Sequence, residues 1–147
     1  MTLIERARAS QWALIPFAGA PGGPILCVQL DKDRWLRADA DASSKPIWPM
    51  PEIDGAFTLV PMPDAKTLAR SMTELSDEEM ARLETFCAEP RNMDEIEDEF
   101  PVTAYWLRRA GILRDEGRKG RKIACVWNGL DLEQLIEVVY DKADLEA

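Results

Sequence analysis

The chain has 147 residues, 46% of them hydrophobic, and 27 acidic against 18 basic side chains give it a net charge of −9. This size and apolar content predict a folded protein with a real core, and no apolar run reaches the roughly 18 residues of a membrane helix. Histidine is absent, and its absence excludes the usual general base, the Ser-His and Cys-His nucleophile pairs and most zinc sites.

The chain up to residue 63 is predicted to be rich in β-strands. Short segments with bulky apolar residues at 11–17, 25–30, 34–37 and 56–60 alternate with turn residues, a pattern typical of a small antiparallel sheet. Residues 38–55 hold three prolines, at 46, 49 and 51, and are expected to be irregular because proline lacks an amide donor. Trp48 lies among these prolines and either docks on the protein's own core, which we favour, or is offered to a partner.

Two ligand sites in this part are considered and set aside. The glycine- and proline-rich segment 19–24 lacks the Gly-Lys-Ser/Thr sequence of a phosphate-binding loop. Four aspartates between 31 and 41 lack the glycine and glutamate that an EF-hand loop requires in register. We therefore expect no metal and no cofactor.

From residue 64 onward the sequence predicts helices, each recognised by a capping residue. A helix from 64 to about 72, one from 76 to about 88 and a last one after 131 have these caps: Asp64, Ser76 with Glu79, and Asp131 with Gln134. This division suggests a β-rich part at 1–63 and a helical part at 64–147, either as two lobes or as one compact domain.

The most informative stretch runs from 92 to 128 and reads NMDEIEDEFPVTAYWLRRAGILRDEGRKGRKIACVWN. Asn92 and Glu95 suit the capping box of a short helix. Pro101 either ends that helix or begins a second one, and Gly111 suits a left-handed C-terminal cap. Two extended runs follow, and the glycines at 117 and 120 suit the tip of a hairpin between them.

Charge is strongly polarised along this part of the chain. Residues 74–99 carry eleven acids against two arginines, a local net charge of −9. Residues 108–122 carry seven basic side chains against two acids, a local net charge of +5. Such polarity predicts a surface that attracts one kind of partner and repels another.

A short helix, a tight corner, a second helix and a ribbon with a basic tip together resemble the winged helix-turn-helix superfamily over the C-terminal half. The resemblance implies an α+β protein whose N-terminal sheet is followed by a helical region and a winged-helix-like module. It also implies a recognition helix at 101–110 and a wing at 117–122. The side chains expected to face a nucleic-acid groove are Ala104, Tyr105, Arg108 and Arg109, and those expected to face phosphates are Arg118, Lys119, Arg121 and Lys122.

Two functions remain open, and neither is catalytic. The first is binding of duplex nucleic acid through the recognition helix and the wing. The second is engagement of a basic, nucleic-acid-handling protein through an acidic band, as in phage anti-defence proteins that mimic DNA; its residues are Asp94, Glu95, Glu97, Asp98 and Glu99. An enzyme is not expected, because these carboxylates belong to an exposed helix face where burial cannot tune their pKa.

Three cysteines, at 27, 87 and 125, are far apart and form no Cys-x-x-Cys motif. They are expected to be reduced core residues, as in most intracellular proteins. Residues 11–17 are too short and broken for the apolar region of a signal peptide, so the protein is expected to be cytoplasmic and to have no membrane partner. The sequence does not determine its oligomeric state.

Overall fold

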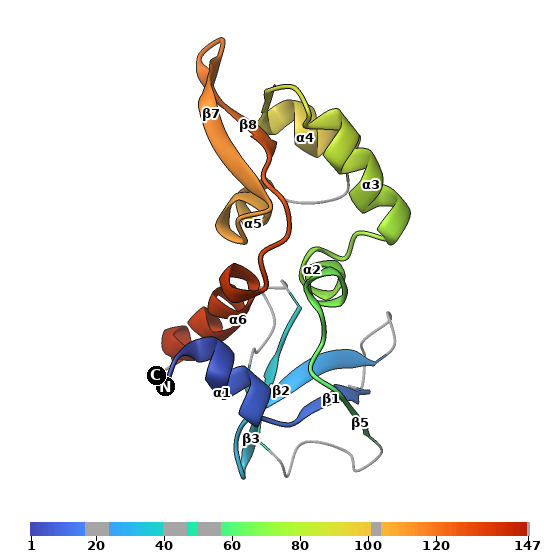
Figure 1. Ribbon diagram of the computed structural model, residues 1–147, viewed down its shortest axis with the longest axis vertical. Helices are drawn as coiled ribbons and strands as arrows, with labels where there is room; N and C mark the ends of the chain where they lie inside the picture. Colours follow the sequence, from blue (N-terminus) through green and yellow to red (C-terminus); the bar gives the residue numbers. More distant parts are fainter. Residues whose placement is uncertain (17–23, 40–46, 50–56, 101–103, 147) are drawn as a thin grey trace.

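The computed structural model describes the chain except residues 17–23, 40–46, 50–56, 101–103 and 147, and it describes only the backbone of 47–49 and 142–146. The protein is α+β, with an antiparallel sheet in the N-terminal part followed by helices and a hairpin, as the sequence predicts. Figure 1 shows an elongated molecule with this sheet towards one end of the long axis and the hairpin at the other.

The N-terminal sheet has five strands in the order β4-β3-β2-β1-β5, and all neighbours are antiparallel. The strands are β1 (Trp12–Ile15), β2 (Ile25–Asp31), β3 (Arg34–Arg37), β4 (Ile47–Pro49) and β5 (Thr58–Val60), and helix α1 (Leu3–Ala9) precedes them. Strand β4 corrects the predicted irregular segment 38–55 at residues 47–49, and residues 40–46 and 50–55 of that segment lie outside the described residues. It is an edge strand, where proline is tolerated because one side needs no hydrogen bonds. The prediction that the Trp48 side chain docks on the core concerns a side chain outside the described part of the structure.

Both faces of this sheet hold buried side chains, which alternate between the faces along β1, β2 and β3. Trp12, Leu26 and Val28 belong to the main hydrophobic core. Their neighbours Ala13 and Cys27 belong to a smaller cluster together with Ile15, Trp35 and the partly buried Phe57. The period of two is the one expected for a strand whose successive side chains point to opposite faces.

Three helices follow the predicted caps, with one difference. Asp64 caps α2 (Ala65–Thr73) by accepting from Thr67 N at 2.8 Å, and Ser76 with Glu79 forms the capping box of α3 (Asp77–Phe86). Helix α6 (Leu132–Glu146) begins after Asp131, whose Oδ1 accepts from Glu133 N at 3.0 Å. Gln134 does not complete a box there, because its side chain reaches the end of another helix.

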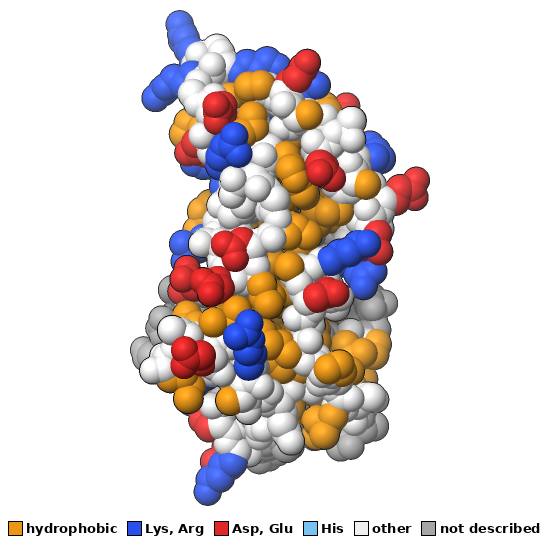
Figure 2. All heavy atoms as spheres, in the orientation of Figure 1, with side chains coloured by type: hydrophobic (Ala, Val, Ile, Leu, Met, Phe, Trp, Pro, Cys, Tyr) orange, Lys and Arg blue, Asp and Glu red, His pale blue; other side chains and the backbone are white. Residues whose placement is uncertain are grey.

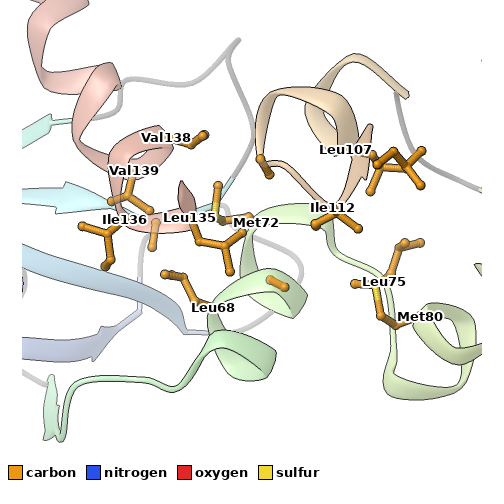
Figure 3. Packing of buried hydrophobic residues seen from close by; sticks show 14 of the residues in the cluster. Leu68, Met72, Leu75, Met80, Leu107, Ile112, Leu135, Ile136, Val138 and Val139 are labelled. Atoms are coloured by element: carbon orange, nitrogen blue, oxygen red, sulfur yellow. The ribbon is translucent and has the colours of Figure 1, made fainter. Parts of the chain in front are cut away.

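The main core joins elements from both parts of the chain. Helix α6 contacts α1, α2 and β3, so the last helix packs beside the first helix and the N-terminal sheet. Figure 3 shows Leu68 and Met72 of α2 against Leu135 and Ile136 of α6. In the same figure Leu75 lies near Ile112, which links this core to the C-terminal helices. The division at residue 63 stays a prediction.

The C-terminal half contains a second, three-stranded sheet with the order β6-β8-β7. The strands of this sheet are β6 (Arg91–Asn92), β7 (Leu113–Lys119) and β8 (Lys122–Trp127), and helices α4 (Met93–Glu99) and α5 (Ala104–Arg109) lie between β6 and β7 in the chain. The Asn92–Glu95 capping box of α4 is confirmed, and so is the hairpin, whereas the two-residue β6 was not predicted. Gly117 has a φ of +75° where the register of the hairpin shifts between Asp115 and Arg118. The strands continue to a turn at 120–121, so the hairpin is longer than predicted.

Candidate nucleic-acid interface

Helix α5 corresponds to the described part of the predicted recognition helix, and 101–103 lie outside the description. Tyr105 is 51% exposed and stacks edge-on with Trp106 at a ring distance of 5.4 Å. Leu107 and Ala110 are buried and anchor the helix in the core. The prediction for Ala104 is wrong, because Ala104 is fully buried on the same face as Leu107 and cannot reach a groove.

Both ends of α5 are closed by side chains from other helices. Glu97 of α4 accepts a hydrogen bond of 2.9 Å from Ala104 N through its Oε1. Gln134 of α6 donates from Nε2 to the carbonyl of Arg109 at 3.0 Å. These contacts satisfy backbone groups that a helix leaves unpaired at its ends. Glu97, predicted as a partner-binding residue, thus has a structural role. Local sequence patterns did not indicate this role, because Glu97 and Ala104 are seven positions apart.

The two arginines of α5 are tied to acids within the chain. Arg108 donates from Nε and Nη2 to the two carboxylate oxygens of Asp115, both at 2.8 Å. These bonds raise the pKa of Arg108 and hold the pKa of Asp115 below its ordinary value. Arg109 pairs with Asp141 of α6. Both arginines are therefore paired within the chain, on the helix that carries the exposed Tyr105.

The lysines of the hairpin tip contact the first turn of α4. Lys119 Nζ lies 2.9 Å from Glu95 Oε2, and Lys122 pairs with Asp94. The bond from Lys119, followed by the backbone amide of Asn92, lowers the pKa of Glu95 below its ordinary value. We call Lys119 and Lys122 the tip lysines. The predicted wing and the predicted acidic band, treated as separate surfaces from the sequence, lie against each other here.

The two arginines of the tip lie differently. Arg118 donates from Nη1 to the carbonyl of Arg121 at 3.3 Å, and within the described residues neither side chain contacts an acid. Both are exposed, and Figure 2 shows basic side chains projecting at the end of the molecule where Figure 1 places β7 and β8. We call Arg118 and Arg121 the tip arginines. They are the part of the predicted wing whose charge is least compensated.

Charge compensation reduces the predicted basic surface. Five of the seven basic side chains between 108 and 122 have an acidic partner, including Arg114 with Glu116 at 3.4 Å. On α4, Asp98 and Glu99 are exposed and have no ion pair with any described residue. The local net charges of +5 at residues 108–122 and −9 at residues 74–99 therefore overstate the electrostatic field that a partner would meet.

A shallow groove of about 590 Å³ lies beside this surface, between α3 and the β6–α4 segment. Its floor contains Phe86 and Phe100, whose rings meet edge-on at 5.7 Å. The Arg82 guanidinium lies 5.2 Å from the Phe100 ring centre, and the Arg91 guanidinium lies 4.3 Å from that of Phe86. Glu78, Glu99 and two further residues, Ala81 and Thr85, complete the lining, so charges of both signs rim an apolar floor.

The described residues hold no group of three or more potential ligands that could bind a metal ion. All three cysteines are buried, as predicted, and Cys87 and Cys125 are free thiols. Burial, followed by the proximity of Cys125, raises the pKa of Cys87 to about 11, and burial also raises the pKa of Cys125. A protonated thiol is a poor nucleophile, so these two cysteines are core residues by chemistry as well as by position. Within the described residues, no helix combines the length and apolar character needed to cross a bilayer.

No protein-family model matches this sequence, and neither a curated protein nor a solved structure does.

Proposed function

We propose that this protein binds duplex nucleic acid without catalysis, through α5 and the hairpin tip used as a winged-helix-like module. The succession of α4, α5 and the β7–β8 hairpin supports the resemblance to the winged-helix superfamily. In such modules a helix enters a groove and other elements hold the phosphate backbone. Tyr105 and the half-exposed Arg109 are the groove-facing candidates of α5, with Arg108 at its margin.

One observation carries the proposal: the tip arginines are exposed, lie at a projecting end of the molecule and contact no acid within the described residues. A guanidinium is always charged and binds phosphate through a fork of donors. Two such groups on one hairpin turn suit two phosphates of a backbone. Free phosphate-binding charge is the property that most duplex-binding surfaces share.

The net charge of −9 opposes this function only in part. Asp94 and Glu95, the acids of α4 that reach the tip, are each paired with a lysine. Acids at the sheet end are separated from the tip by most of the long axis of the molecule (Figure 1). Exposed charges beyond about 8 Å are largely screened at physiological salt, so local compensation matters more than the total.

The experiment is a salt-titrated binding assay with random duplex DNA. Replacing Arg118 and Arg121 with alanine should weaken binding uniformly across sequences and lower the slope of log affinity against log salt by about two units. The matched control replaces Arg8 and Lys32, two exposed basic residues of other elements, and should leave the slope within about half a unit. Unmeasurable affinity of the wild-type protein at about 50 mM salt would eliminate the proposal.

A second function is favoured by the groove. Glu78 and Glu99 rim its apolar floor, and Asp98 adds a further unpaired exposed carboxylate on the same helix as Glu99. These features suit a basic segment of a nucleic-acid-handling protein carrying apolar side chains. In that case Asp98→Asn with Glu99→Gln should weaken partner binding at least about tenfold, while the tip arginine changes should have little effect.

We propose a cytoplasmic location for either function, supported by the buried free thiols of Cys87 and Cys125, which suit a reducing compartment.

A further inference from the structure

We infer that the first turn of α4 acts as an internal competitor for phosphate, a latch that holds the tip lysines and limits duplex binding by the hairpin. The latch consists of Asp94 and Glu95 on α4 and their partners Lys122 and Lys119. This inference rests on the proposed function and adds a means of regulating the same site. Lys119 and Lys122 are paired residues across the β7–β8 register, so both reach α4 from the same place on the hairpin.

Geometry sets the latch apart from ordinary surface ion pairs. Glu95 is held before any lysine arrives, because its Oε1 accepts from Asn92 N at 3.2 Å in the capping box of α4. Its other oxygen, Oε2, receives Lys119 of the hairpin at 2.9 Å and lies 3.8 Å from Arg91 Nη1, which precedes α4. A preorganised acceptor loses less side-chain entropy on pairing than a free one.

The remaining charges on α4 make an internal comparison possible. Asp98 and Glu99 belong to the same seven-residue helix, are exposed, and form no ion pair with a described residue. Removing the charges of Asp98 and Glu99 changes the net charge of the protein as much as removing those of Asp94 and Glu95. Only the removal of the Asp94 and Glu95 charges frees the tip lysines.

The latch has a specific consequence for salt dependence. When a lysine leaves a carboxylate for a phosphate, cations released from the nucleic acid are partly replaced by cations taken up at the exposed carboxylate. The measured slope of log affinity against log salt then underestimates the number of phosphate contacts. Without the carboxylate, each freed lysine adds its full contribution of about 0.9 to the slope.

The test compares Asp94→Asn with Glu95→Gln against Asp98→Asn with Glu99→Gln in the duplex titration. Glutamine at 95 keeps the capping box, because its amide oxygen still accepts from Asn92 N. The first pair should strengthen binding by about 5- to 30-fold at about 50 mM salt and steepen the slope by nearly two units. The second pair should strengthen binding less than about threefold and leave the slope within half a unit.

A single change guards against a variant that does not fold. Asp94→Asn leaves Glu95 and its box untouched and should steepen the slope by about one unit, whereas Asp98→Asn should not. If the wild-type protein binds duplex DNA and the two double variants change affinity and salt slope equally, the latch is overturned and the proposed function stands. No duplex binding by the wild-type protein or any variant at about 50 mM salt would overturn the proposed function and the latch with it.

Discussion

The side-chain amide of Gln134 donates to the backbone carbonyl of Arg109 at 3.0 Å, so the last helix of the chain closes the end of α5. The same side chain limits what can follow α5. A β-carbon added at Gly111 would lie 2.8 Å from Gln134 Cγ, closer than real β-carbon contacts occur. Gly111 also has a φ of +75°, which a residue with a β-carbon adopts only at a cost of about 1–2 kcal/mol.

We therefore expect Gly111→Ala to lower the free energy of unfolding by about 2–4 kcal/mol in urea titration, the sum of backbone strain and overpacking. Gly117 is the matched control, because it has the same φ of +75° but nothing within 4 Å of an added β-carbon. Gly117→Ala should cost only the backbone strain of about 1–2 kcal/mol. Equal losses for the two variants would show that the Gln134 contact has no energetic consequence.

Core continuity predicts cooperative unfolding of the whole chain. Leu135 of α6 is fully buried in the cluster that contains Trp12 of the sheet and Leu107 of α5. Leu135→Ala should cost about 2–5 kcal/mol and shift tryptophan fluorescence and far-UV circular dichroism together. Leu59→Ala, at a position 56% exposed, should cost much less. Two separate transitions would instead support independent parts at 1–63 and 64–147.

Local sequence signals predicted much of this fold. The caps at Asp64, Ser76 and Asn92 depend on residues within three positions of one another, and each forms the expected hydrogen bonds. The hairpin was predictable because glycines supply its positive φ values at 117 and 120. Strands β4 and β6 have only three and two residues, too few for an apolar period to show.

The candidate site was less predictable, because its charges pair across long sequence separations. Lys119 and Glu95 are 24 positions apart, and Arg109 and Asp141 are 32 apart. Composition alone counts all such charges as free. Ala104 was misplaced for a different reason: alanine is small, and on a short helix its side chain gives little local signal for either face. In the structure it shares the buried face with Leu107 and Ala110.

Acid stability should depend on Asp64. Hydrogen bonds from Thr67 hold the pKa of Asp64 below its ordinary value of 3.8 in the folded protein. A lowered folded-state pKa contributes stability above the unfolded-state pKa, and that contribution disappears as the pH falls through the folded-state value. Asp64→Asn keeps a capping acceptor but removes this titration.

The unfolding free energy of Asp64→Asn should consequently decline less than that of the wild-type protein as the pH falls from about 5 to about 2.5. Asp98→Asn, which removes an exposed carboxylate without a described ion-pair partner, serves as the control. Parallel pH profiles for wild type and Asp64→Asn would contradict the role assigned to the cap.

The last prediction concerns Arg108, which the sequence assigned to a nucleic-acid groove and the structure joins to Asp115 by two hydrogen bonds of 2.8 Å. The Arg108 side chain is 29% exposed and that of Asp115 is 50% exposed, so solvent weakens the pair but does not surround it. A double-mutant cycle with Arg108→Ala and Asp115→Ala should give a coupling of about 0.5–1 kcal/mol in the free energy of unfolding. If Arg108 is mainly structural, Arg108→Lys should lower stability, because lysine cannot form the two-bond contact. The salt slope of duplex binding should then stay unchanged. A slope that falls by about one unit in Arg108→Ala, with no coupling to Asp115, would instead place Arg108 on a phosphate.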